Sequence, residues 1–229
     1  MTPVFTKLKK VFVVIVMFTL AFGGYVLIVN RNAENMTGRQ KLLKVVYPLF
    51  VLVNKMVHKN TEILANNKII PPVSFYSLKA VLNNGAVLDM ASLKGKKVLL
   101  VNTASDCGYT GQYDQLQQLY SRFGTRLVVL GFPANDFKEQ EKGTDEAIAL
   151  FCKKNYGVDF PLLQKSIVLK RTGQNSVFKW LTEPAQNGWN KQAPTWNFSK
   201  YLVNETGMLT HYFGPAIEPT DETILEAIR

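Results

Sequence analysis

The sequence predicts an α/β domain preceded by an N-terminal apolar helix and a second, amphipathic helix. The residues from Val11 to Val29 carry no charge, and the apolar β-branched run from Val98 to Val101 is typical of a buried strand. Helical and strand patterns alternate from that run to the C-terminus. We therefore divide the chain into a basic tail with an anchor (1–30), an amphipathic juxtamembrane helix with a linker (31–72) and the α/β domain (73–229).

Charge is unevenly distributed along the 229 residues, whose formal net charge is +10. Residues 1–70 contain ten Lys or Arg and two Glu, a net of +8. Residues 71–229 contain seventeen Lys or Arg and fifteen Asp or Glu, a net of +2. A nucleic-acid-binding domain would concentrate its basic residues on the folded part. The basic N-terminal segment instead indicates a membrane surface, and we expect no nucleic-acid partner.

The uncharged run is long enough, at about 1.5 Å per residue, to cross a hydrocarbon core of roughly 30 Å. A cleaved signal peptide is the competing interpretation, but the run is longer than a usual signal core and no Ala-x-Ala site follows it. We therefore expect an uncleaved, single-pass anchor. Basic residues lie on both sides of the run: Lys7, Lys9 and Lys10 before it, and Arg31, Arg39, Lys41 and Lys44 after it. The numbers of basic residues on the two sides are almost equal, so the positive-inside rule gives little preference. A short basic tail that stays in the cytoplasm would leave the domain outside, and we expect the domain on the extracytoplasmic side.

A second apolar pattern follows the anchor. Thr37 and Gln40 have the spacing of a capping box, which predicts a helix start. One face of this helix is apolar: Leu42, Val45, Val46, Leu49, Leu52, Val53 and Met56. The run is too short to span a bilayer and contains Pro48, so we expect a helix in the membrane interface, with packing on the domain as the alternative. Residues 60–72 are predicted to be a tether that ends at the domain boundary.

The elements of the domain can be predicted in order. The strands are expected at 73–78, 86–88, 98–102, 127–132, 201–203 and 209–213, with a hairpin turn at 83–85. The helices are expected at 111–123, 144–155, 174–181 and 220–228. Alternation alone predicts only a generic α/β class, but a βαβ start, a β-hairpin and a terminal helix form the thioredoxin-type layout.

Cys107 lies in the loop between the strand at 98–102 and the helix that begins near Thr110 or Gly111. Peptide dipoles and unpaired N–H groups at a helix N-terminus favour an anion. We therefore expect the pKa of Cys107 to lie below the ordinary value of about 8.5, which would make its thiolate available for reaction. The alternative is a small buried hydrophobe, which is a common role for cysteine.

Four sequence strings together resemble the cysteine-containing glutathione peroxidases, in family order and spacing. They are NTASDCGYTGQY (102–113), GFPANDF (131–137), FCKKNYGVDFP (151–161) and WNFSKYLV (196–203). The resemblance covers residues 74–229 and implies a thioredoxin fold and thiol peroxidase activity on hydrogen peroxide or organic (lipid) hydroperoxides, without a cofactor. The short connection between Pro161 and Trp196 resembles the monomeric, thioredoxin-dependent branch of the family.

The resemblance also assigns site residues. It makes Cys107 the peroxidatic cysteine, and makes Trp196 and Asn197 the N–H donors that stabilise the thiolate or the departing oxygen. Core packing is the alternative role for Trp196. Asp136 stands where the family usually carries glutamine, and a carboxylate beside Cys107 would raise the pKa of the thiol. We therefore expect Asp136 to point away, to be protonated or to act through water, with Asn135 as an alternative amide.

Cys152 falls where disulfide-forming members of the family carry their resolving cysteine. The resemblance implies that Cys107 sulfenic acid condenses with Cys152, and that a thioredoxin-like dithiol or glutathione reduces the disulfide. A buried helix residue is the alternative role. In a βαβ arrangement we expect the reduced cysteines to lie beyond the roughly 7 Å Cα separation that a disulfide allows. Resolution would then require the end of the 144–155 helix to unravel.

Other function classes fit the sequence less well. A cysteine hydrolase would need a histidine base, and only His211 is a candidate. The Cys-x-x-Cys motif of disulfide oxidoreductases is absent, and two scattered Cys and two scattered His form no metal-ligand pattern. A membrane-tethered redox sensor or relay that uses the same cysteines is the non-enzymatic alternative.

Overall fold

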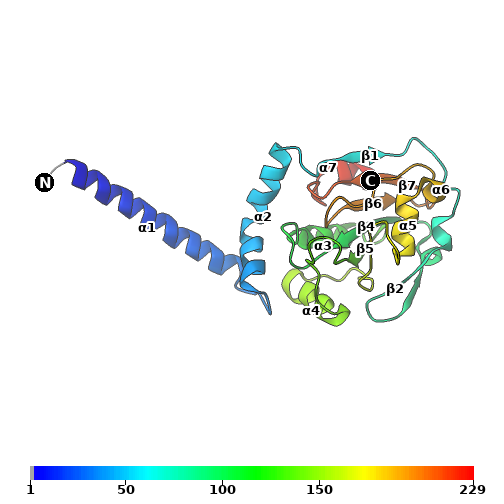
Figure 1. The fold of residues 1–229 in the computed structure, drawn as a ribbon, viewed down its shortest axis with the longest axis horizontal. Coiled ribbons are helices and arrows are strands. Elements are labelled where there is room, and N and C mark those ends of the chain that lie inside the picture. The colour runs from blue at the N-terminus through cyan, green and yellow to red at the C-terminus, as the bar shows by residue number, and fades with distance from the viewer. Residues whose placement is uncertain (1–2) are drawn as a thin grey trace.

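The computed structural model describes the backbone of residues 3–229 and the side chains from residue 10 onward. The predicted basic tail therefore lies partly outside the described residues, and so do the side chains of Lys7 and Lys9. A long helix, α1 (Pro3–Val29), projects from a rounded domain, and a second helix, α2 (Gly38–Met56), runs along the side of the domain that α1 approaches (Figure 1).

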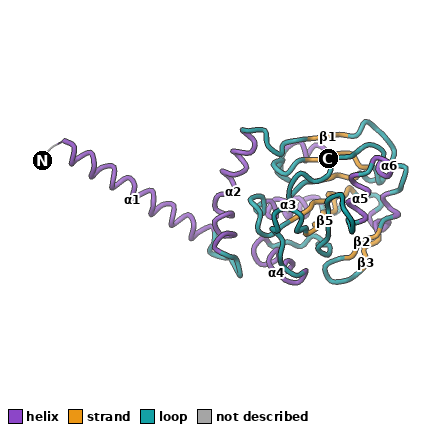
Figure 2. Tube along the Cα trace, viewed as in Figure 1, coloured by secondary structure: helices purple, strands orange, loops and turns teal. Residues whose placement is uncertain are grey.

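The centre of the domain is a mixed sheet. Within the described chain, five strands lie in the order β1–β7–β6–β4–β5 (Figure 1). Figure 2 shows the strands in orange inside the domain, with helices in purple around them. The parallel pair β4 (Lys97–Thr103) and β5 (Leu127–Pro133) is connected through α3 (Gln112–Phe123), which completes the predicted βαβ unit. The hairpin of β6 (Lys200–Val203) and β7 (Leu209–Phe213) adds antiparallel strands next to β4. This arrangement confirms the predicted thioredoxin-like α/β fold.

Side chains of β4 alternate between two apolar layers because successive residues of a strand point to opposite faces. Leu99 and Val101 pack with α3, α4 (Asp145–Tyr156) and α7 (Glu222–Ile228). Val98 and Leu100 pack on the other face, with α5 (Ser176–Thr182). A further short helix, α6 (Pro184–Asn187), follows α5. The sheet is thus covered on both faces, and β4 is buried along almost its whole length.

Two predictions about the start of the domain need correction. The predicted strand at 73–78 contains a 3-10 turn, Phe75–Ser77, and the hairpin consists of β2 (Lys79–Val81) and β3 (Val87–Asp89) in a sheet of their own. The predicted tether contributes β1 (Ile63–Ala65), which pairs antiparallel with β7. This pairing has a physical reason, because the outer edge of β7 would otherwise leave backbone N–H and C=O groups unpaired.

α2 starts at the predicted capping box. Thr37 accepts a hydrogen bond from the backbone N–H of Gln40, and the Gln40 side chain accepts one from the backbone N–H of Thr37. Most of the predicted apolar face is exposed, as expected of a helix in the membrane interface. A second apolar set, which the prediction missed, packs on the domain: Tyr47, Phe50 and Val51. The alternative interpretation, a helix that packs on the domain, is therefore also correct for this second face.

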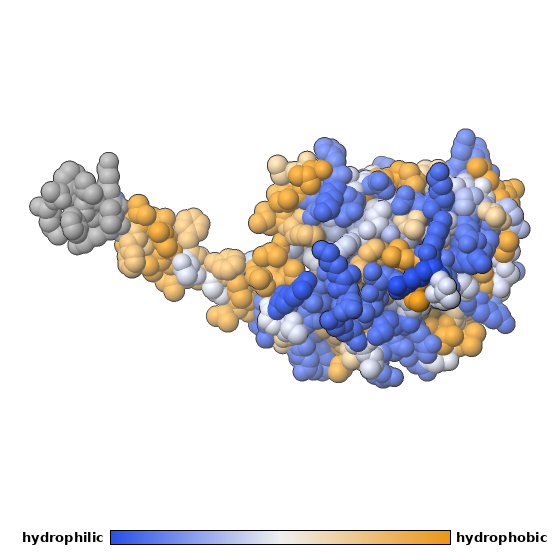
Figure 3. Space-filling model, viewed as in Figure 1, coloured by the Kyte–Doolittle hydropathy of each residue, from blue (hydrophilic) through white to orange (hydrophobic). Residues whose placement is uncertain are grey.

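α1 contains a stretch of 20 residues, Lys10–Val29, with a mean hydropathy of 2.6, and none of this stretch is buried against the rest of the protein. Its length and composition suffice to cross a membrane, although a signal sequence has the same properties. Figure 3 shows that the apolar surface of α1 continues onto the adjoining part of α2.

Candidate active site

The loop after β4 places Cys107 at the edge of the sheet from which α3 starts. Thr110 closes this loop: its hydroxyl accepts from the backbone N–H of Cys107 at 3.0 Å and donates to the carbonyl of Ala104 at 2.9 Å. The backbone N–H of Tyr109 points at the sulfur, with a distance of 3.4 Å between the nitrogen and Sγ. The backbone therefore supplies one direct hydrogen-bond donor to the thiolate form of Cys107.

The predicted low pKa of Cys107 is wrong for this conformation. The side chain has 0% exposure, and burial raises the pKa of the thiol to about 11. The N–H of Tyr109 and the side chains of Trp196 and Asn197 lower the pKa, but they do not offset the loss of water. α3 begins at Gln112, slightly later than predicted. The backbone N–H that donates to Cys107 belongs to Tyr109, in the loop before this helix.

A second loop, at the start of β6, carries Trp196 and Asn197 to the thiol. Asn102, the next-to-last residue of β4, donates from its side chain to the Trp196 carbonyl at 3.1 Å and accepts from the Ser199 N–H at 3.0 Å. Its carbonyl accepts from the N–H of Phe198, a residue with φ of 66°. The end of β4 thus holds both loops of the site, which explains why Trp196 and Asn197 reach Cys107.

Gln140 is a site residue that the sequence analysis missed. Its side-chain oxygen accepts from Asn197 Nδ2 at 3.0 Å, and its carbonyl accepts from the N–H of Asp106 at 3.0 Å. Gln140 is buried and therefore couples the Cys107 loop to the Asn197 amide. The sequence signal for this residue was the polar pair Gln140-Glu141 shortly after GFPANDF. The sequence of a polar loop does not indicate which of its side chains turns inward.

Asp136 and Asn135 are held by other partners, which corrects the prediction of Asn135 as the alternative amide beside the sulfur. Asp136 accepts from the backbone N–H of Val168 at 2.8 Å and forms an ion pair with Arg171. It therefore points away, which is the first of the three expectations. Asn135 is exposed, and its side-chain oxygen accepts from the backbone N–H of Glu141 at 2.8 Å. Both residues shape the loop between β5 and α4 and do not donate to Cys107.

Cys152 lies on the buried side of α4, and both cysteines are free thiols. Burial raises the pKa of Cys152 to about 12, and the nearby Glu141 carboxylate raises it further, while the Tyr113 hydroxyl lowers it. Glu141 itself is fully buried, and burial raises its pKa to about 7. One of its oxygens accepts from the Ser105 hydroxyl at 2.6 Å, whereas Oε2 is buried without a hydrogen-bond partner.

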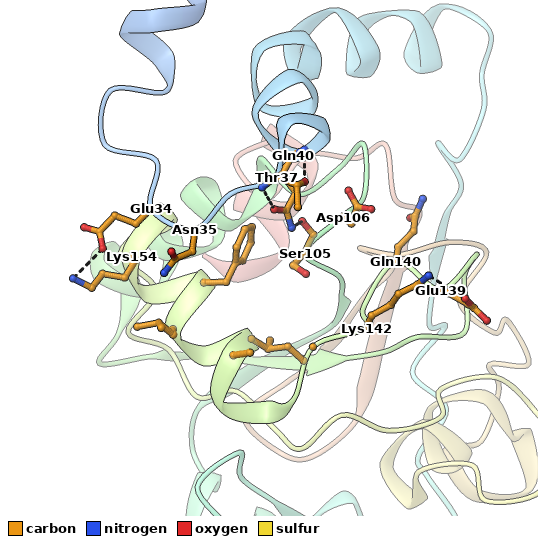
Figure 4. A pocket seen from close by; sticks show the side chains of 15 residues that line it. Glu34, Asn35, Thr37, Gln40, Ser105, Asp106, Glu139, Gln140, Lys142 and Lys154 are labelled. Atoms are coloured by element: carbon orange, nitrogen blue, oxygen red, sulfur yellow. Dashed lines mark hydrogen bonds and ion pairs between the residues drawn. The ribbon is translucent and has the colours of Figure 1, made fainter.

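A cavity of about 440 Å³ lies beside the Cys107 loop (Figure 4). The connector between α1 and α2 and the first turn of α2 form one wall, through Glu34, Thr37 and Gln40. The opposite sides consist of α4 and of the loop that contains Gln140. Ser105 and Asp106 line the cavity, so that it reaches the two residues immediately before Cys107. Within the described residues, no group of three or more His, Cys, Asp or Glu side chains could hold a metal ion.

The buried carboxyl of Glu141 predicts a pH-dependent stability. The pKa of Glu141 in the folded protein, about 7, lies above the ordinary 4.5. The contribution of this carboxyl to the free energy of unfolding is therefore complete below pH 4.5 and is lost as the pH rises through 7. Glu141→Gln should therefore stabilise the protein at pH 8 by about 3 kcal/mol and flatten the profile between pH 5 and 8. Thermal unfolding of the full chain across this range measures the effect. The exposed Glu139→Gln is the control, and identical profiles for the two variants would contradict this prediction.

Comparison with known proteins agrees with this geometry. The family model for glutathione peroxidase matches residues 75–182. The chain is 39% identical over 148 residues to glutathione peroxidase-like peroxiredoxin 2 of Saccharomyces cerevisiae, which covers 64% of this chain and 91% of that protein. It is 41% identical over 147 residues to the glutathione peroxidase homolog BsaA of Staphylococcus aureus, with coverages of 64% and 92%. The crystal structure of Trgpx in its apo form superposes with a TM-score of 0.52 at 31% identity, over 68% of this chain and 93% of that one. The chain therefore belongs to the glutathione peroxidase family, a family of peroxidases.

Proposed function

We propose that this protein is a thiol peroxidase that uses Cys107 to reduce hydrogen peroxide or organic hydroperoxides, including lipid hydroperoxides. The observation that carries the proposal is the convergence of N–H groups on one sulfur. The Tyr109 backbone and the Trp196 and Asn197 side chains all favour the thiolate of Cys107. The names of the relatives, which include peroxidase and peroxiredoxin, support the same reaction class.

The reaction proceeds in three steps. The Cys107 thiolate attacks the terminal oxygen of the hydroperoxide: an S–O bond forms, the O–O bond breaks, and the other oxygen takes a proton and leaves as water or an alcohol. The thiolate of Cys152 then attacks the Cys107 sulfenic acid, so that an S–S bond forms and the hydroxyl leaves as water. Finally, a dithiol reduces the disulfide and is itself oxidised, which restores both thiols. We propose a thioredoxin-like protein for this last step, with glutathione as the alternative reductant.

Trp196 and Asn197 act on the first step. An N–H that donates to the sulfur stabilises the thiolate, and the same group can donate to the oxygen that leaves with the electron pair. The Trp196 ring also packs against the apolar layers on both faces of the sheet. This packing holds the indole in one position, so that its N–H needs little reorganisation during the reaction.

The second step requires α4 to open. Cys152 lies in the interior of the helix, and the C-terminal turn is closed by the N–H of Gly157, which donates to the carbonyls of Cys152 and Lys153. Gly157 has φ of 61°, the left-handed conformation that commonly ends helices. Helix ends open at low free-energy cost compared with global unfolding, so the turn that contains Cys152 can move towards the oxidised Cys107.

We further propose that α1 is an uncleaved single-pass anchor and that the peroxidase domain is monomeric on the extracytoplasmic side. The apolar stretch of α1 and the net charge of the N-terminal segment support a membrane location. The exposed apolar face of α2 gives independent support, because exposed apolar sets of this kind mark interaction sites.

A redox sensor or relay remains the second candidate function. The burial of both thiols favours it, because a protein that oxidises rarely and hands its disulfide to one partner needs no rapid access to solvent. Steady turnover distinguishes the two functions: a peroxidase cycles repeatedly with a thioredoxin system, whereas a sensor oxidises once and cycles slowly without its specific partner.

Cys152→Ser tests the resolving step. In the full chain, in nanodiscs of phosphatidylcholine and phosphatidylglycerol, we expect thioredoxin-dependent turnover of hydrogen peroxide to fall about tenfold or more, while the first oxidation of Cys107 keeps its rate. A coupled reductase assay measures turnover. Leu150→Ser, at an exposed position of the same helix, is the matched control. Equal turnover of wild type and Cys152→Ser would remove Cys152 from the mechanism.

Trp196→Phe tests the donor role against the packing role. Phenylalanine keeps an aromatic ring but lacks the N–H, so we expect Cys107 to be oxidised about tenfold more slowly while the fold stays intact. Rapid-mixing measurements of thiol loss give the rate. Trp189→Phe is the control, because this half-buried indole donates to the Leu209 carbonyl. An unchanged rate in Trp196→Phe would assign Trp196 to packing alone.

A further inference from the structure

α2 covers the peroxidatic loop, although it lies outside the part of the chain that the family model matches. A Cβ atom at Gly108 would lie 2.8 Å from the Phe50 ring, and one at Gly111 would lie 2.7 Å from the Tyr47 ring. Both distances are shorter than real side chains allow, so glycine at these two positions lets the helix approach. The Phe50 ring also packs edge-on against Tyr109, with 4.8 Å between the ring centroids.

This cover blocks the reaction in the conformation described. Cys107 has 0% exposure, and Val51 of α2 belongs to the same buried apolar cluster as the thiol. The terminal oxygen of a hydroperoxide must reach the sulfur before the O–O bond can break. A group that packs on the Cys107 loop must therefore move before the reaction can occur, and α2 is one such group.

The links that hold α2 in place are suited to opening. Arg39 pairs with Asp106 at 3.2 Å, and the Gln40 amide donates to the Ser105 carbonyl at 3.1 Å. At the other end of the helix, Lys55 pairs with Glu218 at 3.0 Å. The ion pairs are partly exposed to solvent, and pairs of this kind contribute little to stability. The cover is also fixed by the apolar set of Tyr47, Phe50 and Val51. Two more polar contacts add to these links: the Tyr47 hydroxyl donates to Glu218 at 3.2 Å, and Lys44 Nζ donates to the Asn155 carbonyl at 3.4 Å.

The other side of α2 offers an alternative apolar environment. Its exposed residues include Leu42, Leu49, Leu52, Val53 and Met56. Figure 1 shows α2 running across the domain-side end of α1 and along the domain. If α1 spans a bilayer, α2 therefore lies between the bilayer and the Cys107 loop. The apolar surface shared with α1 identifies the bilayer interface as the partner of this face, rather than a second protein.

The cavity beside the Cys107 loop would supply room for a substrate. Its wall at Glu34, Thr37 and Gln40 belongs to the segment that leads into α2, so a displacement of α2 moves this wall. The cavity already extends to Ser105 and Asp106, and its volume of about 440 Å³ lies within the usual range of ligand sites. Opening the cover would thus extend this space to the sulfur itself.

We infer that α2 is a cover over the peroxidatic thiol that opens towards the bilayer, and that Tyr47 and Phe50 select lipid-borne hydroperoxides over hydrogen peroxide from water. The inference rests on the proposed function, in which Cys107 is peroxidatic and α1 is the anchor. A lipid hydroperoxide can leave its acyl chain against the outer face of α2 while its –OOH group enters beneath the displaced helix. Hydrogen peroxide has no apolar part to stabilise the open position.

The test uses the full chain in nanodiscs of phosphatidylcholine and phosphatidylglycerol. The rate of Cys107 oxidation is measured with aqueous hydrogen peroxide and, separately, with a phosphatidylcholine hydroperoxide placed in the same nanodisc. Phe50→Ala removes the cover over Gly108, and Leu49→Ala on the exposed face is its matched control. Leu49→Glu with Leu52→Glu weakens the contact of α2 with the bilayer without touching the inner face. Circular dichroism and thermal unfolding verify that each variant is folded.

We expect Phe50→Ala to raise the rate with hydrogen peroxide about tenfold and to change the lipid hydroperoxide rate much less, while Leu49→Ala leaves the hydrogen peroxide rate unchanged. We expect the double glutamate variant to lose about tenfold in the lipid hydroperoxide rate and to keep the hydrogen peroxide rate. Equal effects on both substrates, or no effect of Phe50→Ala, would overturn the inference while oxidation of Cys107 continues. If no variant is oxidised by either substrate, the proposed peroxidase function itself fails.

Discussion

Burial of the Cys107 loop, on which α2 packs, opposes ionisation of the sulfur. Two opposing effects act on this thiol: N–H donors favour the anion, and removal from water disfavours it. In the covered state the second effect is larger, since the pKa of Cys107 is raised to about 11 despite donors from Tyr109, Trp196 and Asn197. The donors are already in place, so under our proposal the entry of water would shift the balance towards the thiolate. In this proposal, access and ionisation are two consequences of one movement.

The end of β4 holds both loops of the site in place. Asn102 holds the loop that carries Trp196, while the continuation of the same strand forms the loop that carries Cys107. Lys200, fully buried at the start of β6, donates to the carbonyls of Phe198, Gly214 and Pro215 and so fixes the other end of the Trp196 loop. The proposed donors therefore lie in loops that strand ends hold in place, whereas the parts that our proposals require to move, α2 and the last turn of α4, belong to separate helices.

Local patterns predicted much of this structure. The apolar run of β4, the helices expected at 111–123 and 144–155, and the capping box at Thr37 each depend on neighbours in sequence, and all four are confirmed. β1 could not be predicted, because Ile63–Ala65 forms a strand only through the free edge of β7, far along the chain. The same holds for the inner face of α2, whose partner is a pair of glycines in a distant loop.

The site was predictable in its residue types but not in its electrostatics. Motif order led to Cys107, Trp196 and Asn197, whereas the orientations of Asp136 and Gln140 depend on Arg171 and Asn197, which are brought close only by the fold. The central claim is that Cys107 is the sulfur that hydroperoxide oxidises. The most direct measurement is mass spectrometry of the full chain in nanodiscs after treatment with lipid hydroperoxide and dimedone, which traps sulfenic acids. The account predicts a dimedone adduct on the Cys107 peptide, whereas an adduct confined to Cys152, or none while hydroperoxide is consumed, would contradict it.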